Sequence, residues 1–401
     1  MATPLIRKDI RKLSVTERDD LVWAFYLIQR LDPEDDDSYF RIAGYHGEPF
    51  RGAGYGNPQW WGGYCNHGNI LFPTWHRAYL FRLEKALQKQ VRGVTIPYWN
   101  EVDDDTSQDG LPEIFLQRTY EFADNRSDPI PNPLWSYTFQ RDIVDRLQTF
   151  PDADYSKPAG TSTCRFPFSG LYGEPDRSTT DAHNSIMNDL GPQKTDAYLN
   201  DNIRTWLNFS SYKTSGGSVY PAGVKDRYEK CLTAPNYTVF SNTTSAAQWN
   251  DDHATDPGFS PVVPLESPHN AIHLAIGGIQ IPVQDGSSIP GANGDMGEND
   301  TAAFDPIFFF HHAFIDYMFW RWQVLNGQTK QLDIEPRFFN YPGTNSVDSQ
   351  GPTPGVAGGT WLTLDSPLDP FSRPGNLLNG RPETPLTSRV GVCAATCVHH
   401  P

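Results

Sequence analysis

Two stretches rich in histidine and aromatic residues constrain this chain more than any other feature. The first is Cys65–Glu84 (CNHGNILFPTWHRAYLFRLE) and the second is Asp305–Asp316 (DPIFFFHHAFID). Between them, His269 and His273 stand four residues apart in PHNAIH. Side chains four residues apart lie on one face of a helix, so we expect these two imidazoles to reach a single metal ion.

The first stretch predicts a loop followed by a buried helix. His67 and His76 are nine residues apart, with Pro73 between them. We therefore place His67 in the loop and His76 in the first turns of the helix. The helix carries an apolar stripe that is expected to face a core, made of Tyr79, Leu80, Leu83, Ala86 and Leu87.

The second stretch predicts another buried helix. Asp305 followed by Pro306 is typical of an N-cap and a first helical turn, and the helix that follows carries His311 and His312. In helical bundles, metal sites are built from side chains on facing helices, so histidines at such positions are candidate ligands.

The ligand types indicate which metal would bind. The sequence has two groups of imidazoles, but no CxxC pair and no HExxH. Neutral imidazole suits zinc, copper, iron and nickel, whereas structural zinc usually adds thiolates and hydrolytic zinc a carboxylate. A double site made of histidine alone therefore favours copper.

These motifs resemble those of the type-3 copper proteins, most closely the secreted fungal tyrosinases and catechol oxidases (polyphenol oxidases). In that family, Cys-x-His followed by WHRxYLxxxE marks one copper site. HxxxH followed by DPxFxxHHxxxD marks the other. The matching residues here are Cys65, His67, Trp75–Leu80, Glu84, His269, His273 and Asp305–Asp316, and His46 in RIAGYHGEPF matches the first ligand. The resemblance covers residues 7–325.

The resemblance implies a mainly α fold, in which an antiparallel helical bundle holds a dinuclear copper centre among long loops and a few short strands. Residues 1–340 would form the oxidase core, and the Pro/Gly-rich residues 341–401 would pack on it within a single domain. The implied ligands are His46, His67 and His76 for one copper ion and His269, His273 and His312 for the other. It also implies a thioether bond between Cys65 and His67.

The implied activity is the oxidation of o-diphenols (catechols) to o-quinones, with O2 as co-substrate reduced to water. Two copper ions suit this reaction because it removes two electrons from each catechol. An o-aminophenol oxidase is the alternative enzyme. A dioxygen carrier uses the same metal pair but shields it from phenols, and this chain shows no evident shield.

The resemblance also allows o-hydroxylation of monophenols, which needs a local base to deprotonate the phenol. In tyrosinase-like relatives, a glutamate before the first histidine of the second copper site and an asparagine just after it hold a water for this role. Glu266 and Asn270 match these positions. The alternative is that Glu266 only fixes its loop. Leu274 is expected to border the pocket, and residues 295–304 are where we expect the residue that controls access.

The remaining histidines are interpreted as structural or exposed. His311 precedes a predicted ligand and points to another helix face, so we expect it to support or pack against the site. His183 and His253 lie in polar sequence, and His399 and His400 end the chain, so all four are expected at the surface.

Asp305, Asp316 and neighbouring backbone carbonyls are candidate acceptors for the ring N–H groups of the histidines. For the two aspartates there are other interpretations. The alternatives are helix capping, which we favour for Asp305, and pairing with an arginine.

Five cysteines and five Asn-x-Ser/Thr sequons favour a secreted glycoprotein. The sequons are at Asn125, Asn208, Asn236, Asn242 and Asn299. With Cys65 in a thioether, four cysteines remain, for which Cys393–Cys397 and Cys164–Cys231 are the candidate disulfides. Free buried thiols are the alternative.

Composition excludes several other classes of partner. The net charge is −16 with a sequence pI of about 5.0, and no basic stripe is present, which disfavours nucleic acid and anionic membranes. No apolar run approaches 18 residues, so no membrane-spanning segment is expected. Small phenols are the expected partners.

Elsewhere the sequence predicts three helices. Ser14–Glu17 forms a capping-box pattern that opens a helix ending near Leu31. Helical patterns also occur at Asn132–Phe150 and Thr195–Phe209.

Overall fold

The computed structural model describes residues 5–52, 62–145, 154–208, 212–213, 219–220, 223–278, 289–333, 341–346, 353–371 and 398–399. Within this part of the chain the α-helices are α1 (Val15–Ile28), α2 (Tyr39–Gly44), α3 (Phe72–Gln90), α4 (Asp104–Asp109), α5 (Arg177–Leu190), α6 (Pro192–Asn208), α7 (Val224–Cys231), α8 (Tyr237–Ser241), α9 (Thr243–His253), α10 (Glu266–Gly277) and α11 (Ile307–Leu325). Short 3₁₀ helices are η1 (Ile10–Lys12), η2 (Glu113–Phe115), η3 (Asp295–Gly297), η4 (Ala302–Phe304) and η6 (Pro342–Thr344).

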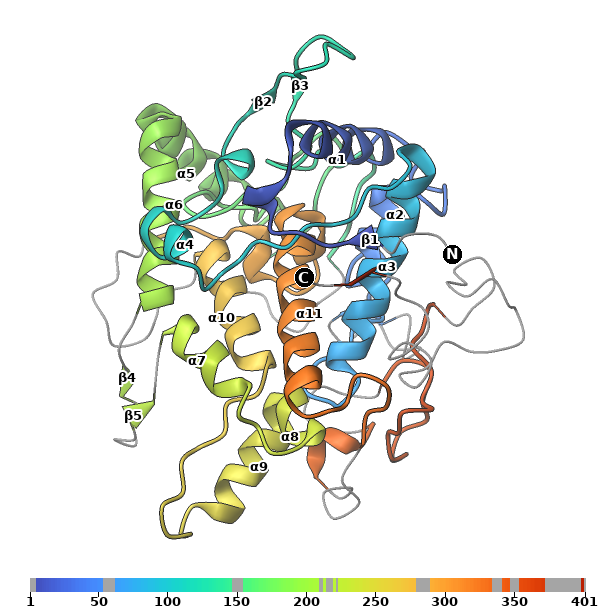
Figure 1. The fold of residues 1–401 in the computed structure, drawn as a ribbon. Helices are drawn as coiled ribbons and strands as arrows, with labels where there is room; N and C mark the ends of the chain where they lie inside the picture. The colour runs from blue at the N-terminus through green and yellow to red at the C-terminus, as the bar shows by residue number, and fades with distance from the viewer. Residues whose placement is uncertain are drawn as a thin grey trace.

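The strands of the described residues are two residues long and form pairs. The pairs are β1 (Leu5–Ile6) parallel to β6 (Val398–His399), β2 (Thr119–Tyr120) antiparallel to β3 (Ile130–Pro131), and β4 (Tyr212–Lys213) antiparallel to β5 (Val219–Tyr220). The predicted fold class is confirmed: the protein is a helical bundle with long loops and a few short strands (Figure 1).

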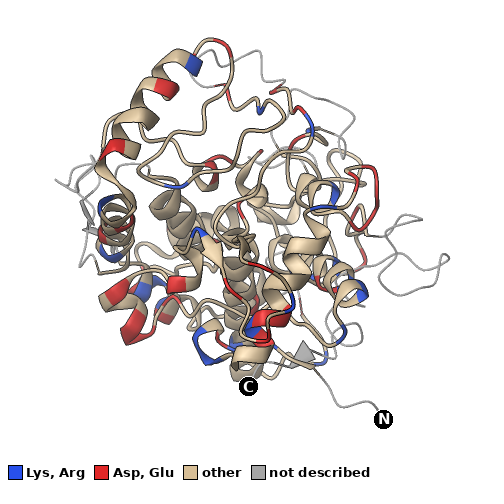
Figure 2. Cartoon of the chain, turned by 90° about the horizontal axis from the view of Figure 1, so that it is seen from above, with Lys and Arg blue, Asp and Glu red and all other residues tan. Residues whose placement is uncertain are grey.

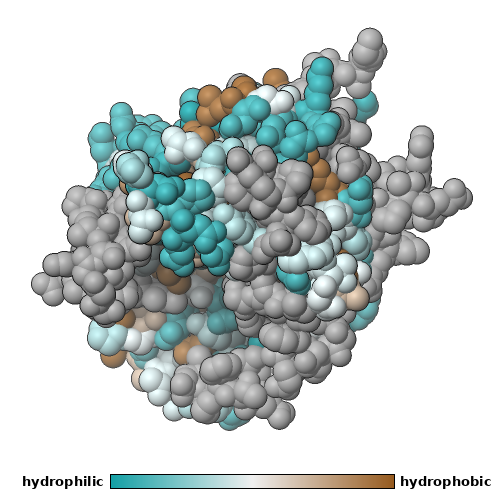
Figure 3. All heavy atoms as spheres, turned by 90° about the horizontal axis from the view of Figure 1, so that it is seen from below, coloured by the Kyte–Doolittle hydropathy of each residue, from teal (hydrophilic) through white to brown (hydrophobic). Residues whose placement is uncertain are grey.

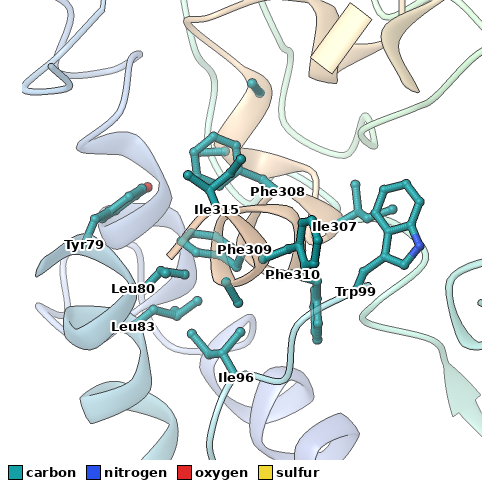
Figure 4. Close-up of a cluster of buried hydrophobic side chains, with 14 of the residues drawn as sticks. Tyr79, Leu80, Leu83, Ile96, Trp99, Ile307, Phe308, Phe309, Phe310 and Ile315 are labelled. Atoms are coloured by element: carbon teal, nitrogen blue, oxygen red, sulfur yellow. The ribbon is translucent and has the colours of Figure 1, made fainter. Parts of the chain in front are cut away.

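Helix α11 lies in the middle of the bundle, with α10 on one side and α3 on the other (Figure 1). It is apolar on almost every side, as expected for a helix that is surrounded by protein. Figure 4 shows Tyr79, Leu80 and Leu83 of α3 in the same buried cluster as Phe308, Phe309 and Phe310 of α11. The ring centroids of Tyr79 and Phe309 are 5.3 Å apart. The stripe predicted on the first helix therefore faces the second.

A buried set of ion pairs also joins these two helices. Arg7 donates two hydrogen bonds of 3.0 Å to Glu84 of α3 and one of 2.8 Å to Asp316 of α11. Arg77 of α3 donates to the other oxygen of Asp316 at 2.5 Å. The segment before α1 is thereby attached to the centre of the bundle.

Local sequence signals account for several helix boundaries. Ser14 and Glu17 form the predicted capping box of α1, and Pro73 lies in the first turn of α3, where a missing N–H costs nothing. Helix α6 lies where a helix was predicted at Thr195–Phe209.

The helix predicted at Asn132–Phe150 is wrong over residues 132–145, which are not helical, and residues 146–150 lie outside the described residues. The side chain of Asn132 accepts from the backbone N–H of Leu134 and donates to the carbonyls of Ile114 and Gln117. Such side-chain bonds compete with helix formation. The backbone of Phe139 pairs instead with that of Thr161.

Charged residues lie mainly on the peripheral helices and loops, where both signs are interspersed (Figure 2). On the face shown in Figure 3, hydrophobic residues are scattered among hydrophilic ones. Among the described residues, no helix combines the length and the apolar character needed to cross a membrane.

Candidate metal centre

The first group of predicted ligands comes from three consecutive segments. His46 follows α2, His67 lies in the loop before α3, and His76 lies in the second turn of α3. Their ring centroids are 5.3 Å (His46–His67), 5.7 Å (His46–His76) and 5.1 Å (His67–His76) apart. The structure therefore brings together three residues that span 30 positions of the sequence, as predicted.

The second group comes from α10 and α11. His269 and His273 lie one turn apart on α10, with centroids 4.6 Å apart, and His312 of α11 lies 4.8 Å from His269 and 5.7 Å from His273. The i, i+4 spacing has the predicted effect, because both α10 rings face the same helix.

The two groups are in contact with each other. The rings of His76 and His312 stack with centroids 4.4 Å apart, and the rings of His67 and His269 are 5.7 Å apart. Six imidazoles thus form one cluster with two halves, which we call the first half-site (His46, His67, His76) and the second half-site (His269, His273, His312).

Four of the six rings have Nδ1 bound to an acceptor. His46 bonds to the carbonyl of Asn299 at 2.9 Å, His76 to that of Phe72 at 2.8 Å and His273 to that of Met296 at 2.9 Å, while His269 bonds to the side-chain oxygen of Asn270 at 2.8 Å. A carbonyl oxygen can only accept, so Nδ1 carries the hydrogen and Nε2 holds a lone pair. This arrangement fixes the ring as a metal ligand requires.

Several ring nitrogens in the cluster are buried with no hydrogen-bond partner among the described residues. They are Nε2 of His46, His76 and His273 and Nδ1 of His312. Buried polar atoms without a partner are costly and rare in folded proteins. A metal ion that accepts their lone pairs would satisfy them, so these residues fit a histidine-bound metal pair.

Burial also keeps the cluster neutral. It lowers the pKa of His46 and of His273 to about 3. Burial, followed by the neighbouring imidazoles, lowers the pKa of His67, His76, His269 and His312 well below the usual value. Neutral imidazole is the form that binds metal, so the site is ready for metal near neutral pH.

A cavity of about 330 Å³ lies next to the second half-site. It is lined by His67, Thr243, Glu266, His269, Asn270, His273, Leu274, Met296, Gly297 and Asn299. A space of this size suits a small ligand, and Leu274 borders it as predicted.

The chain resembles known tyrosinases over most of its length. The family model for the common central domain of tyrosinase matches residues 36–325. A tyrosinase of Aspergillus oryzae is 53% identical over 383 residues, covering 92% of this chain and 69% of that protein. The tyrosinase HcTyr2 of a Hahella species is 48% identical over 367 residues, covering 88% of this chain and 64% of that protein. The chain belongs to the tyrosinase family.

The solved structures give the same result for the fold of this tyrosinase-family chain. The tyrosinase of Burkholderia thailandensis at low pH superposes with a TM-score of 0.82 and 44% identity, covering 99% of this chain and 75% of that one. Relatives thus come from bacteria as well as fungi, so the resemblance is broader than the fungal members alone.

In this tyrosinase-family chain, Glu266 is close to the cavity, but both of its oxygens already accept hydrogen bonds. One accepts from the backbone N–H of Gly68 at 2.7 Å. The other accepts from the backbone N–H of Thr243 at 2.8 Å and from its hydroxyl at 2.9 Å. Glu266 therefore ties the loop that carries His67 to the start of α9, and burial raises its pKa.

The segment Asp295–Asp300 connects the two half-sites, which the sequence did not reveal. Its carbonyls at Met296 and Asn299 hold one histidine of each half-site. Asp295 pairs with Lys157 at 2.6 Å, and Asp300 pairs with Arg51, with all four side chains buried. The one sequence signal for this segment was the expectation that residues 295–304 contain the residue that controls access to the site.

His311 lies beside the second half-site and is fully buried. Its Nδ1 is 2.6 Å from a carboxylate oxygen of Glu101. Sequence reasoning missed Glu101, because nothing in its neighbourhood along the chain points to a histidine 210 residues away.

Two of the histidines that were expected at the surface lie outside the cluster. His183 on α5 bonds to the carbonyl of Pro167 and His253 on α9 to that of Trp249, and both are partly exposed. His399 lies in β6, and His400 lies outside the described residues.

The suggestion that Asp305 and Asp316 orient histidines is wrong. Asp305 accepts three hydrogen bonds from Arg165 and one from the backbone N–H of Ile307 at the start of α11. Asp316 pairs with Arg7 and Arg77. The predicted backbone carbonyls do orient three of the rings, and the amide oxygen of Asn270 orients a fourth.

The predicted Cys164–Cys231 disulfide is also wrong, because both thiols are free. Cys231 lies within α7 and its thiol donates to the carbonyl of Tyr228, whereas the backbone of Cys164 pairs with Asp295. Cys65 is free as well, and one ligand atom each of His46, Cys65 and His67 lies within 4.8 Å of the others. Cys393 and Cys397 lie outside the described residues.

Two of the five sequons cannot carry a glycan in this fold. Asn236 and Asn242 are buried, and their side chains cap α8 and α9. Asn299 lines the cavity beside the histidines. Asn125 and Asn208 are exposed.

Proposed function

We propose that this chain is a copper-dependent oxidase of phenols, which converts o-diphenols to o-quinones while O2 is reduced to water. His46, His67 and His76 hold one copper ion, and His269, His273 and His312 hold the other. The observation that carries this proposal is the contact between two triplets of neutral imidazoles, in which buried ring nitrogens of His46, His76, His273 and His312 have no hydrogen-bond partner among the described residues.

The copper pair, when bound, supplies the exchange of two electrons between the catechol and O2. The chain's own residues keep the site neutral, orient the rings and exclude water. Acceptors on Nδ1 fix four of the six rings, and burial keeps a second proton off each ring. The imidazoles are thus in the form needed to hold the metal without any change of protonation.

The cavity beside the second half-site is where we place the substrate. Leu274, Met296 and Gly297 give it apolar walls, and Asn270 and Asn299 supply amide groups that can meet phenolic oxygens. Because the cavity reaches His67, His269 and His273, a small phenol in it would lie against both halves of the site. This favours an enzyme over a carrier that shields its metals.

Two measurements test the proposal together. After copper loading, metal analysis should give about two copper ions per chain, as two three-histidine sites require. Oxygen uptake should follow addition of 4-tert-butylcatechol, and rates on tyramine and o-aminophenol would separate a catechol oxidase from the alternatives. Reversible oxygen binding without turnover, or less than about one copper ion per chain, would overturn the proposal.

We further propose that Glu266 has two roles in this site. A carboxylate offers about four acceptor positions, and three are used by Gly68 and Thr243. The remaining position, next to Asn270 in the cavity, can hold a water that takes the proton of a monophenol. The same carboxylate anchors the loop of His67.

Glu266→Gln separates these roles. Because Gln is a much weaker base, turnover of a monophenol such as tyramine should fall at least about tenfold more than that of a catechol, in line with the usual contribution of a general base. Thr243→Val is the control: it removes one hydrogen bond but keeps the carboxylate, so the ratio of the two activities should stay near that of the wild type. Equal loss of both activities in Glu266→Gln would leave only the anchoring role.

We also propose that Cys65, which forms no disulfide, is bonded to His67 through a thioether, which their closeness supports. The bond would replace the S–H of Cys65 and a ring C–H of His67, and the proposed co-substrate O2 would accept the two electrons. A mass lower by two hydrogens than that of the free chain would check it.

The exposed sequons at Asn125 and Asn208 support a secreted protein, and treatment with an N-glycosidase of chain purified from its natural source would test this.

A further inference from the structure

A seventh imidazole, that of His311, lies against the second half-site. Its ring centroid is 5.2 Å from that of His269, 5.0 Å from that of His273 and 5.1 Å from that of His312. One ring nitrogen from each of these four residues lies within 4.8 Å of the other three. The second half-site is therefore, by distance alone, a cluster of four histidines.

Glu101 holds His311 as metal ligands are commonly held. Oε1 of Glu101 is 2.6 Å from Nδ1 of His311, and the hydroxyl of Tyr228 donates to Oε2 at 2.5 Å. All three side chains are fully buried. A carboxylate accepts a hydrogen bond from Nδ1–H, which leaves the lone pair on Nε2. Many metal-bound histidines are paired with a carboxylate in this way. Among the described residues, His311 is the one histidine of this cluster that is paired with a carboxylate.

The other nitrogen of His311 is not used by the protein. Nε2 is buried and has no hydrogen-bond partner among the described residues. A ring that served only to stack on His269 could be a phenylalanine, which would avoid a buried polar atom without a partner. The preserved lone pair beside three predicted ligands points to a metal ion as its partner.

We propose that His311 is itself a metal-binding residue, which with His269 and His273 forms an alternative three-histidine site for a copper ion entering the second half-site. The ion then passes to His312. This inference rests on the proposed copper function. An ion that loses its water on entering a buried site needs replacement ligands, and Glu101 holds the ring of His311 in position to supply one.

Copper stoichiometry of the variants tests this without any measurement of turnover. His312→Ala leaves three imidazoles in the second half-site, so at saturating copper it should still bind about two ions per chain. His311→Phe/His312→Ala leaves two imidazoles and should bind about one ion. The double variant His183→Phe/His312→Ala is the matched control, since His183 lies outside the cluster, and it should behave like His312→Ala.

Electron paramagnetic resonance of the Cu(II)-loaded variants provides a second measurement of copper binding. The spectrum of His312→Ala should contain a second Cu(II) signal with nitrogen hyperfine structure, in addition to the first-half-site signal that both variants share. The proposal is overturned if His312→Ala binds only about one copper ion, or if the two variants bind the same amount. If the wild type itself binds less than about one ion, the proposed function fails as a whole, which distinguishes the two failures.

Glu101→Gln tests the same proposal in a chain that keeps all seven histidines. Gln can still accept from Nδ1 of His311, but an amide holds the ring less firmly than a carboxyl group that also bonds to Tyr228, so copper uptake by the metal-free chain should slow several-fold. Glu113→Gln, at an exposed position, is the control and should load at the wild-type rate. An unchanged rate in Glu101→Gln would contradict the role of His311 in loading.

Discussion

At the scale of single residues, position rather than hydrogen bonding distinguishes the site histidines. His183 and His253 also bond to backbone carbonyls, as His46 and His273 do. They differ in lying outside the two groups of imidazoles that gather among the described residues. Burial beside other imidazoles removes the charged form, and this makes the ring a ligand.

This difference predicts how acid changes the stability of the metal-free protein. The pKa of His273 is about 3 in the folded chain and near 6.5 when unfolded. Between these values the unfolded state binds more protons, so the free energy of unfolding falls as pH falls, by about 1.4 kcal/mol per pH unit for each such histidine. The contribution is complete above the unfolded pKa and is lost towards pH 3.

His273→Phe isolates this contribution from those of the buried carboxyl groups. In urea unfolding between pH 6.5 and 4, its stability should fall less steeply than that of the wild type, by up to about 1.4 kcal/mol per pH unit. His183→Phe should follow the wild-type slope. A His273→Phe slope equal to that of the wild type would show that this ring is already protonated in the folded chain.

At the scale of elements, the segment Asp295–Asp300 does more for the site than any helix does alone. It is short and irregular, yet it supplies a carbonyl to His46 and another to His273. Its two ends are fixed by the buried pairs Lys157–Asp295 and Arg51–Asp300. The segment, which begins with η3, is thereby attached to the rest of the protein near both ends.

Lys157→Met should show how much the segment depends on that attachment. It would leave the carboxylate of Asp295 buried without its cation, which typically costs about 3–5 kcal/mol. Urea unfolding measures the loss, and copper should also be released at lower chelator concentration. Lys89→Met removes an exposed partner of Asp37 and should cost less than about 1 kcal/mol. Similar losses in both variants would mean that the buried pair contributes little.

At the scale of the whole molecule, the first described residues are part of the core. Arg7 is fully buried and bridges Glu84 of α3 and Asp316 of α11, so the two central helices share one cation from a distant part of the chain. Later residues contribute as well, since Leu362, Leu368 and Phe371 join the same hydrophobic cluster. The indole N–H of Trp75 donates to the carbonyl of Asp369 at 2.7 Å.

Arg7→Met should therefore affect the bundle as a whole. Two buried carboxylates lose a partner, and we expect a loss of about 3–5 kcal/mol in the free energy of unfolding, measured by urea titration. Lys8→Met, at the neighbouring exposed pair with Glu17, should change it by less than about 1 kcal/mol. If Arg7→Met unfolds at the wild-type urea concentration, the buried network does not join the helices.

The sequence allowed the helices of the site to be predicted, because their signals are local. The i, i+4 spacing of His269 and His273, the proline after His67 and the capping box at Ser14 each depend on a few neighbouring residues. The helix proposed at Asn132–Phe150 failed because the side chain of Asn132 forms competing bonds to the backbone.

The partners that orient the site could not be predicted in this way. Glu101 meets His311 across 210 residues, and Asp305 meets Arg165 across 140. Such pairs are set by how the helices pack, so the carboxylates that looked like histidine partners turned out to bind arginines. Backbone carbonyls were expected among the acceptors and do hold most of the rings, but every residue has a carbonyl, so no sequence pattern marks which ones would be used.

The shared segment Asp295–Asp300 implies that the two metal sites fill cooperatively. An ion bound at His273 restrains Met296, and the same short stretch of backbone sets the carbonyl that faces His46. Ordering that stretch for one ion lowers the entropy that must be lost for the next. The second equivalent of metal should consequently bind more tightly than the first, and half-filled molecules should be scarce in a titration.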